Sequence, residues 1–158
     1  MVCGQETTKT DASRPAPGLL KVTNDVKTWR FEQHEQGKGN LSVDGQSIKF
    51  ETTKLSDQTW HVQAHIVDLN LKQEQKYTLK FKLKSDDFQQ VNLMAVVDVP
   101  DWHQIGLYEE LATTRKFKEH EFSFTATNVV PGKNRIGFTL GHGKGSVWIR
   151  DMTLTEAK

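Results

Sequence analysis

The sequence predicts an all-β protein in which two antiparallel sheets pack face to face as a β-sandwich. Three observations support this prediction: apolar and polar residues alternate in many segments, turn residues separate these segments, and no stretch keeps the apolar stripe of a long helix. Many short strands without helical crossovers are typical of antiparallel pairing in two layers. With 158 residues, of which 35% are hydrophobic, the chain forms one domain with a substantial core.

The clearest strand is expected at residues 76–85. Odd positions from 77 to 83 hold Tyr, Leu, Phe and Leu, whereas even positions from 78 to 84 hold Thr and three Lys. A period of two places these sets on opposite faces of a half-buried strand, whereas a helix would scatter the apolar residues around its circumference.

The folded domain is expected to span residues 19–158. Residues 1–18 contain almost nothing to bury and end in an Arg-Pro-Ala-Pro-Gly segment, which is typical of a disordered tail or linker. Residues 109–112 could form at most one or two helical turns. The expected strands are residues 28–32, 40–44, 46–52, 59–67, 76–85, 90–98, 104–108, 116–126, 134–140 and 145–155.

Two turns are marked by their residues. Asp44-Gly45 joins two short alternating segments and predicts a two-residue hairpin, because both positions tolerate a positive φ. The Pro-Gly-Lys-Asn sequence at residues 131–134 predicts another sharp turn.

The last strand changes its alternation. Val147 and Ile149 share one register, whereas Met152 and Leu154 belong to the other, so we expect a β-bulge near residues 150–151. The predicted core consists of Val62, Ala64, Ile66, Tyr77, Leu79, Phe81, Leu83, Val91, Leu93, Ala95, Val97, Phe122, Phe124, Ile136, Phe138 and Leu140.

Charge and composition disfavour several function classes. Lys plus Arg total 21 against 20 for Asp plus Glu, a net charge of +1, so nothing steers the whole protein toward nucleic acid. No run of 18 apolar residues exists, so no membrane span is expected, and residues 1–3 are too short for a signal peptide. The single cysteine, Cys3, allows no internal disulfide.

Several weak motifs occur in a characteristic order. They are Trp29, the Trp-x-x-Gln of residues 60–63, the Tyr-x-Leu-x-Phe-x-x-Lys-Ser of residues 77–85, the Phe-Ser-Phe-Thr of residues 122–125, and the Ile-x-Asp-x-x-Leu of residues 149–154. In this combination the chain resembles the non-catalytic carbohydrate-binding modules of families four, nine and twenty-two, over roughly residues 20–156. It departs from their pattern at Phe117, where a Trp often precedes the next strand, and at Arg150, which is commonly Asp.

The resemblance implies a galactose-binding-like jelly-roll sandwich that binds a polysaccharide such as xylan or β-glucan without cleaving it. It also implies a monomeric, extracellular or cell-surface module that serves an associated glycoside hydrolase. No cofactor is required, although related modules often hold a structural calcium ion, for which Asp151 matches one ligand. Cys3 and the polar residues after it are also similar to the start of a mature bacterial lipoprotein; the alternative is an unstructured tail with one thiol.

Aromatic residues outside the core are the candidates for stacking on sugar rings. Trp102 is the first choice, because it lies in a polar loop that turns at Pro100, and Tyr108 follows in the same region. The alternatives are that Trp102 anchors the loop under the sandwich and that Tyr108 packs in the core or at its edge.

Trp60 and Gln63 match the related modules' Trp-x-x-polar pattern, in which the Trp contributes to the cleft and the polar residue binds hydroxyls. Residues three apart point to opposite faces of a regular strand, so both reach one cleft only if Trp60 lies in a loop or irregular entry; otherwise Trp60 packs in the core. His61 and His65 are further hydroxyl partners or plain surface histidines. On a strand they would stand roughly 13 Å apart and could not share a zinc ion.

Two other functions remain open. A jelly-roll glycoside hydrolase or lyase would need two carboxyl groups about 5 to 9.5 Å apart, which residues 98, 101, 109 and 110 could supply. A protein-binding adhesion sandwich would instead expose an apolar patch. The lysines of residues 80–84 are expected to keep a sheet soluble; if they lined the groove, acidic glycans would be the ligands.

Overall fold

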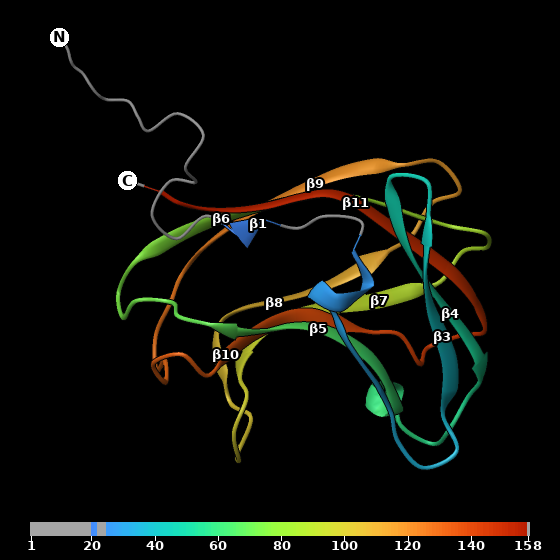
Figure 1. Ribbon diagram of the computed structural model, residues 1–158, viewed down its shortest axis with the longest axis horizontal. Helices are drawn as coiled ribbons and strands as arrows, with labels where there is room; N and C mark the ends of the chain where they lie inside the picture. The colour runs from blue at the N-terminus through green and yellow to red at the C-terminus, as the bar shows by residue number, and fades with distance from the viewer. Residues whose placement is uncertain (1–19, 22–24, 158) are drawn as a thin grey trace, which may run out of the picture.

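The computed structural model describes residues 20–21 and 25–157, which form an antiparallel two-sheet jelly-roll sandwich (Figure 1). The first sheet has the order β3 (Lys38–Asp44), β4 (Ser47–Lys54), β11 (Gly145–Glu156), β6 (Lys76–Ser85) and β9 (Lys118–Thr125), and β1 (Leu20–Lys21) also pairs with β11. The second has the order β2 (Arg30–Gln33), β5 (Val62–Leu69), β10 (Asn134–Thr139), β7 (Gln90–Val97) and β8 (Gln104–Ala112). Two short 3₁₀ helices, η1 (Val26–Thr28) and η2 (Thr59–His61), precede β2 and β5.

All ten expected strands are present, with three differences. Residues 59–61 form η2 instead of the start of β5, and the short β1 was not predicted. Residues 109–112, for which the sequence allows at most one or two helical turns, form no helix, because β8 continues to Ala112. Leu111 extends the buried alternation of Leu107 and pairs with Val91, so the sheet overrides the helical preference of this segment.

The predicted hairpin turn and bulge are present, and the turn is shifted by one residue. Asp44 pairs with Ser47, so the hairpin turn consists of Gly45 and Gln46, one residue later than expected, with Gly45 at a φ of 62°. The register between β11 and β6 shifts after Arg150, at the predicted bulge. The predicted tail at residues 1–18, including Cys3, lies outside the described residues.

The core prediction is confirmed apart from Phe122, which is half-buried against the core. Aromatic contacts join the two sheets there. Phe138 of β10 meets Phe81 of β6 edge-on, with ring centroids 5.5 Å apart, and Trp29 meets Phe50 of β4 at 5.1 Å. Within the described part of the chain, no helix is long and apolar enough to cross a membrane.

Replacing Phe138 with alanine is expected to lower the free energy of unfolding by about 3 to 5 kcal/mol, because the side chain is fully buried between the sheets. Urea denaturation measures this change. Phe88→Ala is the matched control, because Phe88 is 71% exposed and its loss should change stability by less than about 1 kcal/mol. Equal effects of the two substitutions would contradict the assigned core.

Candidate functional site

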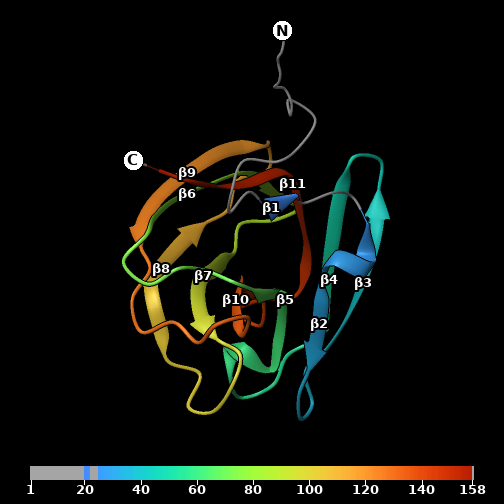
Figure 2. The ribbon, with the colours of Figure 1, turned by 60° about the vertical axis from the view of Figure 1, so that its left-hand side comes forward.

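A cleft of about 650 Å³ opens on the outer face of the second sheet, whose five strands lie side by side in Figure 2. Side chains alternate along each strand, so residues between the core positions point into this cleft. Every strand of the sheet contributes to its lining. The strand residues are Glu32 of β2, Gln63 of β5, Arg135 and Thr139 of β10, Asn92, Met94 and Val96 of β7, and Tyr108 of β8.

Three aromatic rings border the cleft and remain open to solvent. Trp60, Trp102 and Tyr108 line it with exposed fractions of 46%, 52% and 40%. Trp60 lies on η2, so the irregular entry that would let it share the cleft with Gln63 is present. Trp102 lies in the loop before β8 at a φ of 55°, and its backbone N–H donates to Val99. The core alternatives for Trp60 and Tyr108 are therefore wrong.

Histidines support the Trp60 ring. His61 meets it edge-on with centroids 4.4 Å apart, and His34 lies at 5.6 Å. His61 is buried, and its Nδ1 is 2.7 Å from Ser56 Oγ. His61 is not among the described residues that line the cleft, so its position suits support of the Trp60 ring better than contact with a ligand.

The side chain of His65 is fully buried beneath the cleft. Its Nε2 donates to Gln63 Oε1 at 2.6 Å, and Gln63 Nε2 donates to Glu32 Oε1 at 3.3 Å. Gly137 of β10 leaves room for the imidazole, because a Cβ there would lie 2.3 Å from His65 Nδ1. The interpretation of His61 and His65 as plain surface histidines is wrong.

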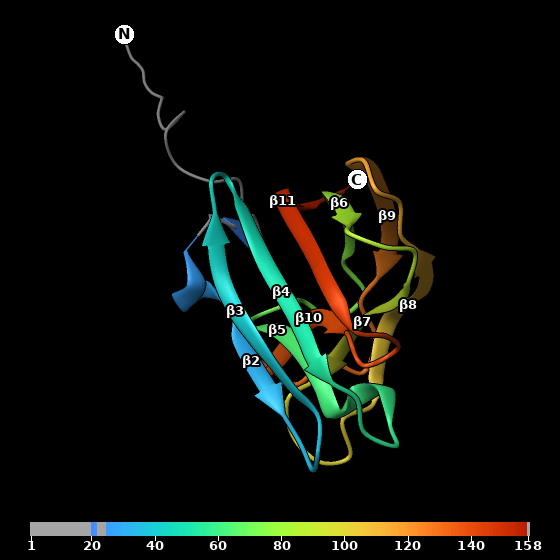
Figure 3. The same ribbon diagram turned by 90° about the vertical axis from the view of Figure 1, so that its right-hand side faces the viewer.

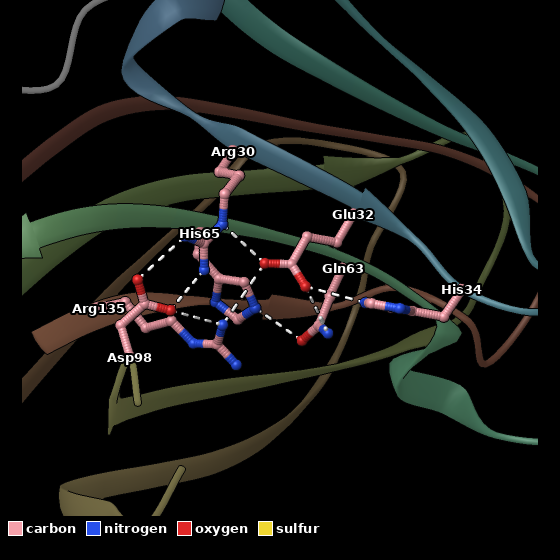
Figure 4. Close-up of polar contacts among 7 residues, drawn as sticks. All are labelled: Arg30, Glu32, His34, Gln63, His65, Asp98 and Arg135. Atoms are coloured by element: carbon pink, nitrogen blue, oxygen red, sulfur yellow. Dashed lines mark hydrogen bonds and ion pairs between the residues drawn. The ribbon is translucent and has the colours of Figure 1, made fainter. Parts of the chain in front are cut away.

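Four charged side chains form a cluster along one side of the cleft (Figure 4). Arg30 binds Asp98 through two hydrogen bonds of 3.0 and 2.5 Å and donates to Glu32 at 2.7 Å. Arg135 Nη1 lies 3.1 Å from Asp98 and 3.5 Å from Glu32. The two arginines thus join two carboxylates from strands distant in sequence, and the charges of the cluster balance.

These contacts set the pKa values. The hydrogen bond from Arg30 lowers the pKa of Asp98 and outweighs the effect of burial. Burial raises the pKa of Glu32, but the hydrogen bond with His34 and the charges of Arg30 and Arg135 outweigh it, and the net pKa is lowered. Burial, with the Arg135 charge, lowers the pKa of His65 to about 3. At neutral pH Glu32 and Asp98 are therefore ionised, and His65 beneath the cleft is neutral.

Two buried polar atoms of cleft residues have no hydrogen-bond partner among the described residues: Thr139 Oγ1 and Arg135 Nε. Buried polar groups in proteins are nearly always hydrogen-bonded. Both atoms are covered by protein, so the polar groups that the cleft floor offers to hydroxyls are chiefly the amides of Gln63 and Asn92, beside the apolar side chains of Met94 and Val96.

Sequence reasoning missed Arg30, Glu32 and Arg135, and named Asp98 only as a catalytic alternative. A signal was present, since Arg30 and Glu32 flank the apolar Phe31 and are placed on the opposite face by the alternation. The pairing partners were hidden, because Arg30 and Asp98 are 68 positions apart in the chain.

The residues around Asp151 do not fit a calcium ion. Asp151 lies at the β11 bulge, with its carboxylate 3.4 Å from Lys82 Nζ and 3.9 Å from Arg150 Nε. Across residues 20–21 and 25–157, no group of three or more His, Cys, Asp or Glu side chains could hold a metal ion. A structural calcium ion stays a prediction of the resemblance.

Comparison with known proteins gives a structural likeness. The sequence matches no protein-family model, and no curated protein matches it significantly. A family 4 carbohydrate-binding module superposes with a TM-score of 0.73 and 19% identity, over 82% of this chain and 86% of that one. The second N-terminal cellulose-binding domain of Cellulomonas fimi β-1,4-glucanase C superposes with a TM-score of 0.69 and 15% identity, over 94% of this chain and 99% of that one.

A third solved structure was determined with a sugar bound. The family 11 carbohydrate-binding module from Clostridium thermocellum, in complex with a β-1,3-1,4-mixed-linked tetrasaccharide, superposes with a TM-score of 0.60 and 14% identity, over 89% of this chain and 95% of that one. The chain therefore has the jelly-roll fold of carbohydrate-binding modules.

Stability is expected to fall between pH 6.5 and pH 5 because of His65. Its pKa is about 3 in the folded protein, whereas an ordinary histidine titrates near 6.5, so the unfolded chain binds more protons in this window. This group alone contributes a loss of up to about 1.4 kcal/mol per pH unit as the pH falls. Urea denaturation at several pH values measures the slope.

In the His65→Gln variant the slope between pH 6.5 and pH 5 should be markedly smaller, whatever its stability at neutral pH. His34→Gln is the control, because it removes an imidazole that contacts Glu32 at a more exposed position. An unchanged slope in His65→Gln would contradict burial of a neutral His65.

Proposed function

We propose that the protein binds a neutral β-linked polysaccharide, such as xylan or β-glucan, in the cleft of the second sheet without cleaving it. The observation that carries this proposal is the set of three solvent-exposed rings, Trp60, Trp102 and Tyr108, around a cleft that combines apolar side chains with a few polar groups. Aromatic side chains of this size are mostly buried in proteins. A group of them that is exposed around one cleft therefore indicates a site for a ligand or partner.

The two parts of the cleft suit the two chemistries of a sugar. A pyranose ring presents a face of C–H bonds that packs on an indole or phenol ring, and Trp60 and Trp102 offer such faces. Its hydroxyl groups need partners that donate and accept, which the amides of Gln63 and Asn92 provide on the outward side of the strands.

The charges near the cleft favour a neutral ligand. Arg30 and Arg135 are paired with Glu32 and Asp98, so the cluster adds little net field to the cleft. A ligand carboxylate would have to compete with these protein carboxylates for the same guanidinium groups. Binding in the cleft is therefore expected to depend little on salt concentration.

The same cluster argues against a glycoside hydrolase. Hydrolysis needs one carboxylic acid with a raised pKa as proton donor, whereas the pKa values of both Glu32 and Asp98 are lowered. Asp101 is instead hydrogen-bonded to His103 at 2.7 Å. An adhesion sandwich would bind its partner through a continuous apolar surface. In this cleft polar side chains such as Gln63 and Asn92 interrupt the apolar lining.

A module of this kind would raise the local concentration of an associated enzyme or cell surface on its polysaccharide. The likeness to a cellulose-binding domain of a β-1,4-glucanase supports this role. The proposal includes an extracellular or cell-surface location and a monomeric state, as the resemblance implies.

Affinity electrophoresis in gels containing xylan, mixed-linkage β-glucan, mannan or pectin tests the proposal. Retardation by a neutral β-glycan is expected, and Trp60→Ala and Trp102→Ala should each weaken binding by about tenfold or more, because each removes a stacking face. Both rings are about half exposed, so the variants should stay folded.

Phe88→Ala is the matched control, because it removes an exposed aromatic ring that is not part of the cleft lining. Reducing-end release is assayed in the same samples, and none is expected. Sugar release that depends on Glu32 would identify an enzyme, and equal binding by all three variants would reject the cleft as the site.

A further inference from the structure

The outer face of the first sheet, on the side of the sandwich away from the cleft, carries cations interleaved with aromatic rings. Trp148 of β11 pairs in register with Lys49 of β4 on one side and Lys84 of β6 on the other. Lys49 Nζ lies 5.5 Å and Lys84 Nζ 4.9 Å from the indole centroid. Figure 3 shows β4, β11 and β6 as successive strands of this sheet.

The arrangement continues toward β9. Lys84 Nζ also lies 4.9 Å from the centroid of Phe117, and the Arg150 guanidinium carbon lies 4.1 Å from the same ring. Lys49, Trp148, Lys84, Phe117 and Arg150 thus form one continuous cationic row. Trp148 Nε1 donates to Asp44 Oδ2 at 2.8 Å, which fixes the indole within the row.

Part of the charge in the cationic row is not compensated by the protein. Within the described residues, Lys49 and Lys84 form no ion pair with a carboxylate, whereas the neighbouring Lys82 pairs with Asp151 at 3.4 Å and Lys80 with Glu119 at 3.6 Å. The excess is local to Lys49 and Lys84, because carboxylates lie beside the rest of the row: Asp44 at Trp148 and Asp151 at Arg150. The chain as a whole has a formal net charge of only +1.

The rings of the row face cations and therefore offer few free faces for stacking. Trp148 has Lys49 and Lys84 near its ring, and Phe117 has Lys84 and Arg150. Nucleic-acid bases need open aromatic faces, and insertion into a membrane needs protruding apolar side chains. The row instead offers positive charge to a ligand. Lys49 and Lys84 lie on β4 and β6, which are separated by β11 and therefore about 10 Å apart.

We propose that the cationic row is a second binding site, for an acidic polysaccharide that carries carboxylate or sulfate groups along its chain. An extended polyanion can follow the outer face of a sheet and place successive acidic groups near Lys49, Lys84 and Arg150. The proposal does not rest on the function of the cleft, because the two sites lie on outer faces of different sheets. With both sites, the protein would bridge an acidic and a neutral polysaccharide.

Affinity electrophoresis and calorimetric titration with polygalacturonate and dextran sulfate test this site. Binding is expected at low ionic strength and should weaken strongly as salt is raised, because exposed charges are screened. The Lys49→Gln/Lys84→Gln double variant should bind about tenfold more weakly than the unchanged chain. Lys27→Gln/Lys133→Gln is the matched control, because it removes the same charge at two exposed lysines outside the row.

The cleft variants separate the two sites. Trp60→Ala and Trp102→Ala should bind the acidic polymers as the unchanged chain does, even where they no longer bind neutral glycan. The proposal is overturned if neither polymer binds, if the two double variants weaken binding equally, or if single-stranded RNA or vesicles with anionic lipids bind more tightly than both polymers.

Discussion

The alternation of side chains along β5, β10 and β7 is the constraint on which both the core and the cleft depend. Ile136 and Phe138 fill the core, while Arg135 and Thr139, on either side of this pair in the sequence, face the cleft. A shift of one residue in the pairing of β10 would exchange these sets and bury an arginine among apolar side chains. The fold is therefore specified by the same pattern that supplies the proposed binding surface.

Electrostatics divides the two outer faces of the sandwich. Beside the cleft, Arg30 and Arg135 are satisfied by Glu32 and Asp98, so aromatic rings and neutral polar groups remain to meet a ligand. On the opposite sheet, cations associate with rings and keep their charge available. A chain with almost no net charge can in this way present a balanced ion-pair cluster on one face and lysines without a carboxylate partner on the other.

Local pattern was enough to predict the sandwich and nearly all of its core, because burial follows the period-two alternation, and it named the aromatic residues of the cleft as candidates. It failed where distant strands decide the outcome. His65 is buried because Gly137, from a strand more than 70 positions later, leaves space for its ring, and the arginine cluster joins β2, β10 and the end of β7. Trp60 was undecided until η2 replaced the start of the expected strand.

The tryptophan indole N–H signals in a ¹H–¹⁵N correlation spectrum test the central claim most directly, because the chain has four tryptophans in different settings. Titration with a mixed-linkage β-glucan oligosaccharide is predicted to shift the signals of Trp60 and Trp102, which line the cleft. The signals of Trp29, in the core, and Trp148, on the opposite sheet, should stay in place. A shift of Trp148 alone, or no shift at saturating concentrations of xylan and β-glucan oligosaccharides, would contradict sugar binding in this cleft.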